Sequence, residues 1–220
     1  MNENKLIVCG FYTDSYKDDI ERLEISLMRF DMEYQFTRVE PKSCWEETTG
    51  IKPSVLKDCL LNNPGTDVLY LDADAFVRRK ISGFDDFDGD IGIHFNEQGG
   101  AKSSHAVRTG TIFLRNNKNT LDFLNCWIKK QAEDKHYCDQ DSFQLAYSEN
   151  KNTSFFNLPV SYVKIFDKDN VESYIEHFQA SRREEDNKAV SRKQNKKRRN
   201  IALILINFAL YGVFYYLGGL

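Results

Sequence analysis

Two aspartates separated by one residue are the first candidates for chemistry. Asp72 and Asp74 stand at the end of the nearly continuous apolar run DVLYLDA (67–73), with Asp74 directly after it. Such a run is typical of a strand that is buried on both faces of a mostly parallel sheet. Carboxylate oxygens are hard ligands, and two of them at the carboxyl end of one strand can reach the same divalent cation. The spacing predicts a metal site, with two solvated acids in a turn as the alternative.

The rest of the chain must supply the elements that hold these acids in place. Apolar residues recur at helical spacing in residues 18–30, and Pro53 suits the first position of a helix that runs through Leu61. Strands are predicted over 5–11, 33–39, 67–73, 90–95, 107–116, 161–166 and 172–178, and further helices over 120–130 and 140–149. The alternation of strands and helices predicts an α/β fold with a mixed, mostly parallel, Rossmann-like sheet flanked by helices.

Charge is distributed unevenly along the 220 residues. Residues 181–200 hold nine Lys or Arg and three Asp or Glu, whereas residues 1–180 hold 21 basic and 30 acidic side chains, a net charge of −9. A domain this acidic is a poor candidate for contact with nucleic-acid phosphates, so we expect no nucleic-acid partner. The expected organisation is a catalytic domain over 1–182 and a basic linker over 183–200.

The last twenty residues, IALILINFALYGVFYYLGGL, contain no charged side chain. Twenty helical residues rise about 30 Å, which matches the hydrocarbon core of a bilayer. Basic residues precede the segment, and such residues tend to stay on the cytoplasmic side. Residues 201–220 are therefore predicted to form a transmembrane helix or membrane anchor, with the catalytic domain in the cytoplasm. A buried core helix or an oligomerisation helix is the alternative.

An apolar strand that ends in Asp-x-Asp about seventy residues into an α/β domain resembles the glycosyltransferases of the GT-A fold. The similarity covers roughly residues 5–182. It includes Phe11-Tyr12-Thr13, Lys52-Pro53, Asp139-Gln140-Asp141, Ile175-Glu176-His177-Phe178 and Ser181-Arg182, of which Lys52-Pro53 resembles the glycogenin-like and galactosyltransferase-like members. The chain departs from the family at Thr109-Gly110-Thr111, where members often have an Asn before the Gly, and it lacks their late Lys-Pro-Trp.

The resemblance implies a metal-dependent nucleotide-sugar transferase. Asp72, Asp74 and His177 would bind Mn²⁺ or Mg²⁺, with Asp72 touching the ion or the ribose. Transfer from such a donor releases a diphosphate, whose negative charge a divalent cation stabilises as a Lewis acid. A site that combines imidazole with carboxylates suits Mn²⁺ better than an all-oxygen site does.

The resemblance also implies contacts to the donor, which would be a UDP-sugar. Tyr12 and Thr13 would contact the nucleotide base, and Lys52 and Arg182 would add positive charge near the phosphates. The catalytic contacts to the donor sugar would come from Asp139, Gln140 and Asp141. The acceptor could be a glycan, a lipid-linked saccharide or a protein, and the similarity of the Asp-Gln-Asp segment favours retention of anomeric configuration.

Each of these residues also has a purely structural interpretation. His177 could be a satisfied core or surface histidine, and Tyr12 a core aromatic residue. Asp139 and Asp141 could lie in the first turn of a helix, where acids interact favourably with the helix dipole. Lys52 could be a solvated lysine.

Three other functions are alternatives to a glycosyltransferase on the sequence alone. In haloacid-dehalogenase-like phosphatases Asp72 would be a nucleophile, but Phe76 stands where those enzymes have Thr or Val. A sugar nucleotidyltransferase would have a glycine-rich loop after the first strand, and FYTDSYKDD contains no glycine. A catalytically inactive, membrane-tethered module that keeps the fold is the non-enzymatic alternative.

Overall fold

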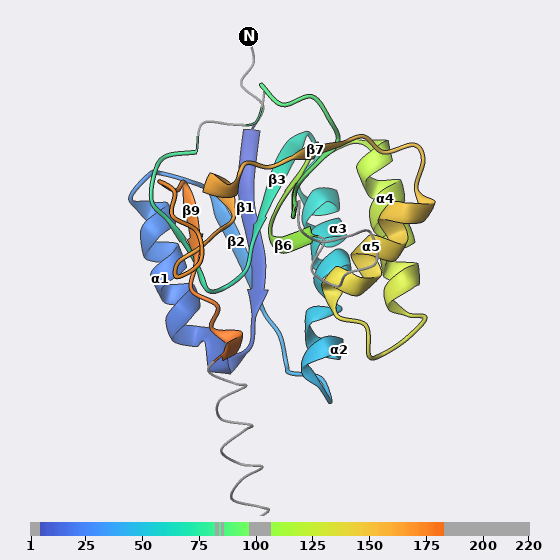
Figure 1. Ribbon diagram of the computed structural model, residues 1–220, viewed down its shortest axis with the longest axis horizontal. Helices are drawn as coiled ribbons and strands as arrows, with labels where there is room; N and C mark the ends of the chain where they lie inside the picture. The colour runs from blue at the N-terminus through green and yellow to red at the C-terminus, as the bar shows by residue number, and fades with distance from the viewer. Residues whose placement is uncertain (1–4, 82–83, 85, 97–106, 183–220) are drawn as a thin grey trace, which may run out of the picture. The chain divides into compact units, whose positions relative to one another are not determined.

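The computed structural model of the chain describes residues 5–81, 84, 86–96 and 107–182. Contacts divide the chain into two units, residues 1–178 and 179–220. The first unit contains a six-stranded sheet with the strand order β2-β1-β3-β6-β5-β7 (Figure 1). Its strands are β1 (Lys5–Tyr12), β2 (Tyr34–Arg38), β3 (Thr66–Leu71), β5 (Ile91–Phe95), β6 (Val107–Leu114) and β7 (Phe155–Asn157).

Five strands of this sheet run in one direction, and β6 runs against them. β1 pairs in parallel with β2 and β3, and β5 pairs in parallel with β7, whereas β6 is antiparallel to both β3 and β5. Parallel neighbours need crossover connections, which here contain helices. These are α1 (Lys17–Met28) between β1 and β2, and α2 (Trp45–Thr49) and α3 (Lys52–Asn62) between β2 and β3. The predicted mixed, mostly parallel α/β sheet is confirmed.

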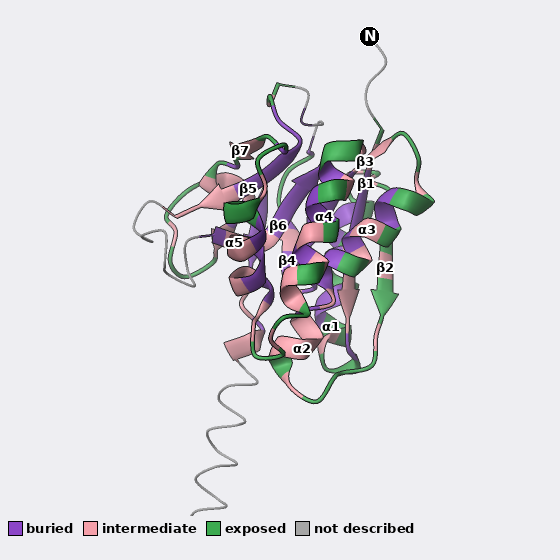
Figure 2. Cartoon of the chain, turned by 90° about the vertical axis from the view of Figure 1, so that its right-hand side faces the viewer, coloured by how far each residue is buried: buried purple, intermediate pink, exposed green. Residues whose placement is uncertain are grey.

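The strand β3 is buried on both faces, as its apolar sequence predicts. Val68 and Tyr70 pack with apolar side chains of α3, α4 (Lys118–Gln131) and α5 (Asp139–Glu149). Leu69 and Leu71 point the other way and pack with α1 and a second, smaller sheet. Figure 2 shows the buried residues along the central strands. The end of β3 is thus held from both sides, which fixes where the chain leaves the sheet.

The smaller sheet joins segments that are far apart in sequence. Its strands lie in the order β4-β9-β8, with β4 (Ala75–Val77), β8 (Lys164–Ile165) and β9 (Ile175–His177). β9 is antiparallel to β4, and Ala75 lies opposite His177. This pairing brings the end of β9 beside the turn that follows β3.

The sequence-based prediction is wrong in part for the last strands. Residues 160–162 form a 3-10 helix, so only two residues of the strand predicted over 161–166 lie in β8. The strand predicted over 172–178 shortens to β9. The short elements α2, β4 and β7 were not predicted. Strands of two or three residues are too short for an alternating pattern, and they form because a partner strand supplies their hydrogen bonds.

The predicted basic linker 183–200 and apolar helix 201–220 lie outside the described residues. In the part of the chain that the structure describes, no helix is both long and apolar enough to cross a bilayer.

Asp90 directly precedes β5 and is hydrogen-bonded to the residues that directly precede α4 and β7. Its carboxylate accepts hydrogen bonds from the backbone and hydroxyl of Ser154, at 2.8 Å each, and from the Asn117 amide at 2.7 Å. Asn117 in turn caps α4 by accepting a hydrogen bond from the Thr120 backbone. Burial by itself raises the pKa of Asp90, but the hydrogen bonds from Ser154 and Asn117 hold that pKa below its ordinary value.

We expect Asp90→Ala to lower the free energy of unfolding by about 3 kcal/mol at pH 7, because it leaves buried donors without an acceptor. A carboxyl whose pKa is lowered by folding contributes stability above its unfolded pKa and loses it as the pH falls through the folded pKa. The difference between wild type and variant should therefore shrink as the pH falls below about 4. Urea denaturation at several pH values measures this difference. Asp122→Ala, an exposed acid on α4, is the control, and an equal loss in both variants would contradict the role of Asp90.

Candidate active site

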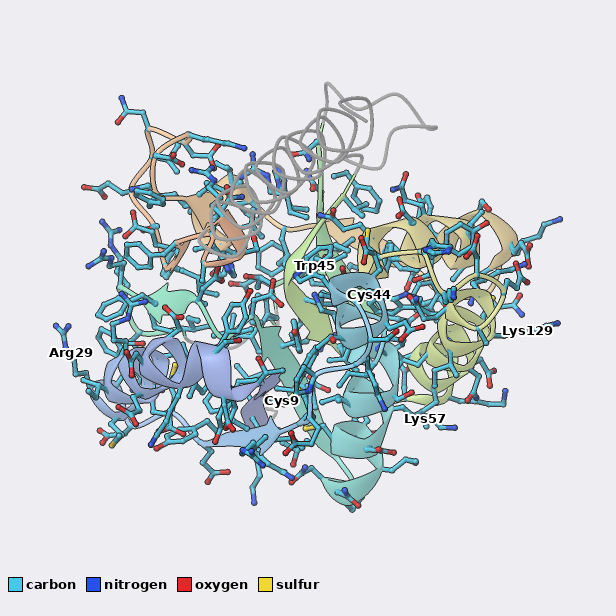
Figure 3. The ribbon with its side chains drawn as sticks, turned by 90° about the horizontal axis from the view of Figure 1, so that it is seen from below. Cys9, Arg29, Cys44, Trp45, Lys57 and Lys129 are labelled. Carbon is cyan, nitrogen blue, oxygen red and sulfur yellow. The ribbon has the colours of Figure 1, made fainter. Side chains whose placement is uncertain are left out.

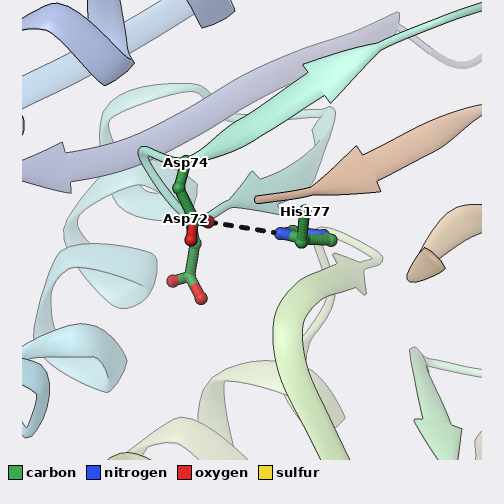
Figure 4. Close-up of side chains that lie close together, drawn as sticks. All are labelled: Asp72, Asp74 and His177. Carbon is green, nitrogen blue, oxygen red and sulfur yellow. Dashed lines mark ion pairs between the residues drawn. The ribbon is translucent and has the colours of Figure 1, made fainter. Parts of the chain in front are cut away.

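Three side chains that could bind a metal converge beyond the carboxyl end of β3. Asp72, Asp74 and His177 each offer one ligand atom, and these atoms lie within 4.8 Å of one another (Figure 4). Nδ1 of His177 lies 3.6 Å from Oδ1 of Asp74. Two carboxylates and an imidazole at this spacing can bind one divalent cation.

Backbone hydrogen bonds place the two aspartates. The amide of Asp72 donates to the carbonyl of Gly110 on β6, at 2.9 Å, and the carbonyl of Asp72 accepts from the Ala75 amide at 2.9 Å. The chain therefore turns tightly between β3 and β4. The carbonyl of Asp74 accepts from the amide of Phe178, which follows β9. Each acid is held by a different neighbouring strand.

His177 is oriented by a threonine behind it. Its Nε2 lies 2.8 Å from Oγ1 of Thr111, and the same hydroxyl donates to the carbonyl of Tyr162 at 2.8 Å. A hydroxyl carries one hydrogen, so Nε2 of His177 must be the donor to Thr111. In the neutral ring Nδ1 is then the nitrogen with the lone pair, and it lies on the side of Asp74, where a cation would need it.

Gly110 leaves the space between these ligands open. A Cβ at this position would lie 3.0 Å from Cε1 and 3.1 Å from Nδ1 of His177, and 3.2 Å from Oδ2 of Asp72. A side chain here would crowd the imidazole and the carboxylate together. The residues present thus fit a metal ion in their chemistry, their separation and the room between them.

A buried lysine connects this group to the start of α5. Lys52 is 2% exposed, and Nζ lies 2.5 Å from Oδ2 of Asp139, 3.1 Å from the Thr109 carbonyl and 3.1 Å from Oδ1 of Asp72. Burial lowers the pKa of Lys52, but the charges of Asp139 and Asp72 more than offset this and keep the pKa above its ordinary value. Each of the three ammonium hydrogens has an oxygen partner inside the protein.

Tyr70 completes the same group of side chains. Its hydroxyl donates to Oδ1 of Asp72 at 2.7 Å, and the ammonium of Lys52 lies 4.7 Å from its ring centroid. Burial first, and then the charge of Asp72, raise the pKa of Tyr70 well above its ordinary value. The phenol therefore stays protonated and donates its hydrogen.

The Asp-Gln-Asp segment forms the first turn of α5, as the structural interpretation anticipated. Asp139 also accepts a hydrogen bond from the hydroxyl of Thr109 at 2.7 Å. Gln140 donates to the carbonyl of Val107. Asp141 accepts from the amide and the thiol of Cys138 and so caps the helix. Burial, then the neighbouring acids, raise the pKa of Cys138 to about 12, so its thiol keeps its hydrogen.

The remaining predicted contacts lie at the end of β1 and in the second unit. Tyr12 is the last residue of β1, is partly exposed and packs against the apolar cluster beneath α1. Thr13 is buried, and its hydroxyl is hydrogen-bonded to that of Ser15 at 2.9 Å. Arg182 belongs to the second unit, where its amide donates to the carbonyl of Gln179. The nucleotide contacts assigned to these residues stay predictions.

Tyr70, both threonines of β6 and Gly110 were not predicted to take part in the site. The position of Tyr70 beside Asp72 could have been predicted, because residues i and i+2 of a strand share a face and Tyr70 precedes Asp72 by two residues. Thr109 and Thr111 carried no local signal, since their partners come from α5 and β9.

The family model described as nucleotide-diphospho-sugar transferase matches residues 14–195. The chain belongs to this family. The prediction of a nucleotide-sugar transferase is confirmed, and the phosphatase and nucleotidyltransferase alternatives have no support.

Solved glycosyltransferases share the fold at low sequence identity. A glycosyltransferase involved in the glycosylation of the major capsid of PBCV-1 has a TM-score of 0.61 and 11% identity, covering 80% of this chain and 93% of that chain. GlyE of Streptococcus pneumoniae TIGR4 has a TM-score of 0.54 and 15% identity, and its apo form has 16%. The chain spans 55% of GlyE. No curated protein sequence matches the chain. These likenesses show a GT-A-like fold.

We expect Lys52→Met to lower the free energy of unfolding by about 3–5 kcal/mol, because it leaves the buried carboxylate of Asp139 without its counter-ion. Lys57→Met is the matched control, since Lys57 lies on the outside of the same helix (Figure 3). Its loss should stay within about 0.5 kcal/mol. Urea denaturation of both variants at pH 7 measures the two losses, and similar values would show that Lys52 is not essential to the buried network.

Proposed function

We propose that the chain is a metal-dependent glycosyltransferase that uses a nucleotide-diphosphate sugar, with UDP as the nucleotide. The observation that carries the proposal is the convergence of Asp72, Asp74 and His177 within 4.8 Å, in a chain of the nucleotide-diphospho-sugar transferase family. Ligands bind outside the carboxyl ends of strands in open α/β sheets, which is where these residues lie.

Three side chains would bind the cation. Asp72 and Asp74 would bind the cation through oxygen, and His177 would bind it through Nδ1. A bound divalent cation acts as a Lewis acid on the departing diphosphate. The imidazole favours Mn²⁺ over Mg²⁺, because nitrogen is a softer ligand than oxygen. Thr111 would keep the ring of His177 turned toward the aspartates.

We also propose that the transfer retains the anomeric configuration. An inverting enzyme needs a carboxylate base beside the acceptor hydroxyl. Asp139 is 4% exposed and paired with Lys52, and Asp141 is engaged at the N-terminus of α5. Both acids are thus engaged by the protein, and the similarity of the Asp-Gln-Asp segment to that of the family supports retention. The acceptor would be a glycan, free or carried by a lipid or a protein.

We expect the full chain to bind UDP in a Mn²⁺-dependent manner, as measured by calorimetric titration. We also expect it to turn over a UDP-sugar. Asp74→Asn should weaken Mn²⁺-dependent UDP binding by about 100-fold or more, since losing even an outer partner of a metal ligand costs 10–100-fold. Asp122→Asn, at an exposed acid on α4, should bind as the wild type does.

Undiminished turnover by Asp74→Asn would refute the proposed metal site. Binding of GDP in place of UDP would correct the nucleotide alone. A folded wild-type chain that binds neither nucleotide would favour the inactive module.

We propose further that residues 201–220 attach the enzyme to the cytoplasmic face of a membrane, with the basic residues of 192–199 attracted to anionic lipids. The absence of charge over twenty residues supports this attachment. The full chain should float with vesicles in a density gradient. Leu205→Asp with Leu210→Asp should release it, because an acid near the middle of a spanning helix costs about 2.5–3.5 kcal/mol. Leu205→Met with Leu210→Met is the control. A wild-type chain that stays out of the vesicle fraction would contradict the attachment.

A further inference from the structure

The two oxygens of the Asp72 carboxylate have different surroundings. Oδ1 accepts a hydrogen bond from the Tyr70 hydroxyl at 2.7 Å and forms an ion pair with Nζ of Lys52 at 3.1 Å. Oδ2 lies on the side of Gly110, where a Cβ would come within 3.2 Å of it and within 3.1 Å of Nδ1 of His177. One oxygen is thus held by the protein, and the other lies beside Gly110, as Nδ1 of His177 does.

The ring of Tyr70 is held in place by the residues packed around it, and the ring determines the position of the hydroxyl. Tyr70 is 1% exposed within the core between β3 and the helices. Its ring lies 6.3 Å from that of Phe11 on β1, and the ammonium of Lys52 lies over it at 4.7 Å. Because Tyr70 and Asp72 lie two residues apart on an extended strand, their side chains share one face. The hydroxyl therefore meets the carboxylate without any movement of the backbone.

We propose that Tyr70 is a positioning residue for the cation. Its hydroxyl holds Oδ1 of Asp72 and thereby presents Oδ2 to the metal as a single, fixed ligand atom. The inference rests on the proposed function, because it presumes that Asp72 binds a divalent cation. It adds a residue that touches neither the metal nor the substrate, and it assigns the two carboxylate oxygens different tasks.

Tyr70 is a sharper test than Lys52, although both donate to the same oxygen. Lys52→Met would remove a positive charge 3.1 Å from Oδ1 of Asp72, which by itself strengthens the binding of a cation. Tyr70→Phe removes one hydroxyl and leaves every charge and the aromatic ring in place. A change in metal affinity would then report on the orientation of Asp72 and not on the charge of the site.

The experiment measures Mn²⁺ affinity of the full chain without nucleotide, by the electron paramagnetic resonance signal of free Mn²⁺. Tyr70→Phe should raise the dissociation constant about 10–100-fold, the usual effect of losing an outer partner of a metal ligand. Tyr34→Phe deletes the same atom from β2 of the same sheet and should leave the dissociation constant unchanged. Circular dichroism checks that both variants are folded.

A second variant separates the hydrogen bond from the volume of the hydroxyl. Tyr70→4-fluorophenylalanine fills much of the space but donates no hydrogen, so its Mn²⁺ affinity should fall as in Tyr70→Phe. It also tests the proposal should Tyr70→Phe fail to fold.

Wild-type affinity in either folded variant at position 70 would overturn the positioning role and leave the proposed function intact. A wild-type chain that binds no Mn²⁺ would overturn both. A lower melting temperature with an unchanged dissociation constant would make Tyr70 a purely structural residue.

Discussion

The ammonium of Lys52 is the charge around which the site is built. Removing an unpaired carboxylate such as that of Asp139 from water costs several kcal/mol, and a second acid nearby would also repel it. Lys52 offsets both effects because it lies between Asp72 and Asp139, 3.1 Å and 2.5 Å from their oxygens. It stands at the start of α3, Asp72 follows β3, and Asp139 begins α5. A single buried charge thus joins two helices to the central strand.

The second constraint is the pairing of β4 with β9. Ala75 lies opposite His177 in this ladder, so backbone hydrogen bonds determine how far the imidazole is from Asp74. The amide of Phe178 extends the contact to the carbonyl of Asp74 itself. Side chains then complete the arrangement, with Thr111 behind the ring of His177 and no side chain at Gly110 in front of it. The separation between His177 and Asp74 thus depends on the pairing of β4 with β9.

What could be predicted from the sequence follows from the range of each interaction. The burial of β3 and the helical stripe of α1 leave periodic patterns, so the α/β sheet and the place of Asp72 and Asp74 were predictable. An ion pair between Lys52 and Asp139, 87 residues apart, leaves no pattern at all. The contacts of Lys52 with Asp139, Asp72 and the Thr109 carbonyl could therefore not be predicted. His177 was found only through family resemblance, because the two-stranded contact that places it is equally non-local.

Charge balance connects these observations to the choice of ligand. Asp72, Asp74 and Asp139 bring three negative charges to the end of β3, and Lys52 supplies one positive charge. His177 adds a nitrogen ligand on the side of Asp74. A divalent cation would be attracted by these carboxylates, whereas a diphosphate alone would be repelled by them. The negative net charge of the domain therefore does not exclude a phosphate-bearing ligand, because these acids would repel phosphate only while no cation is bound to them. For that reason we expect the nucleotide to follow the metal into the site.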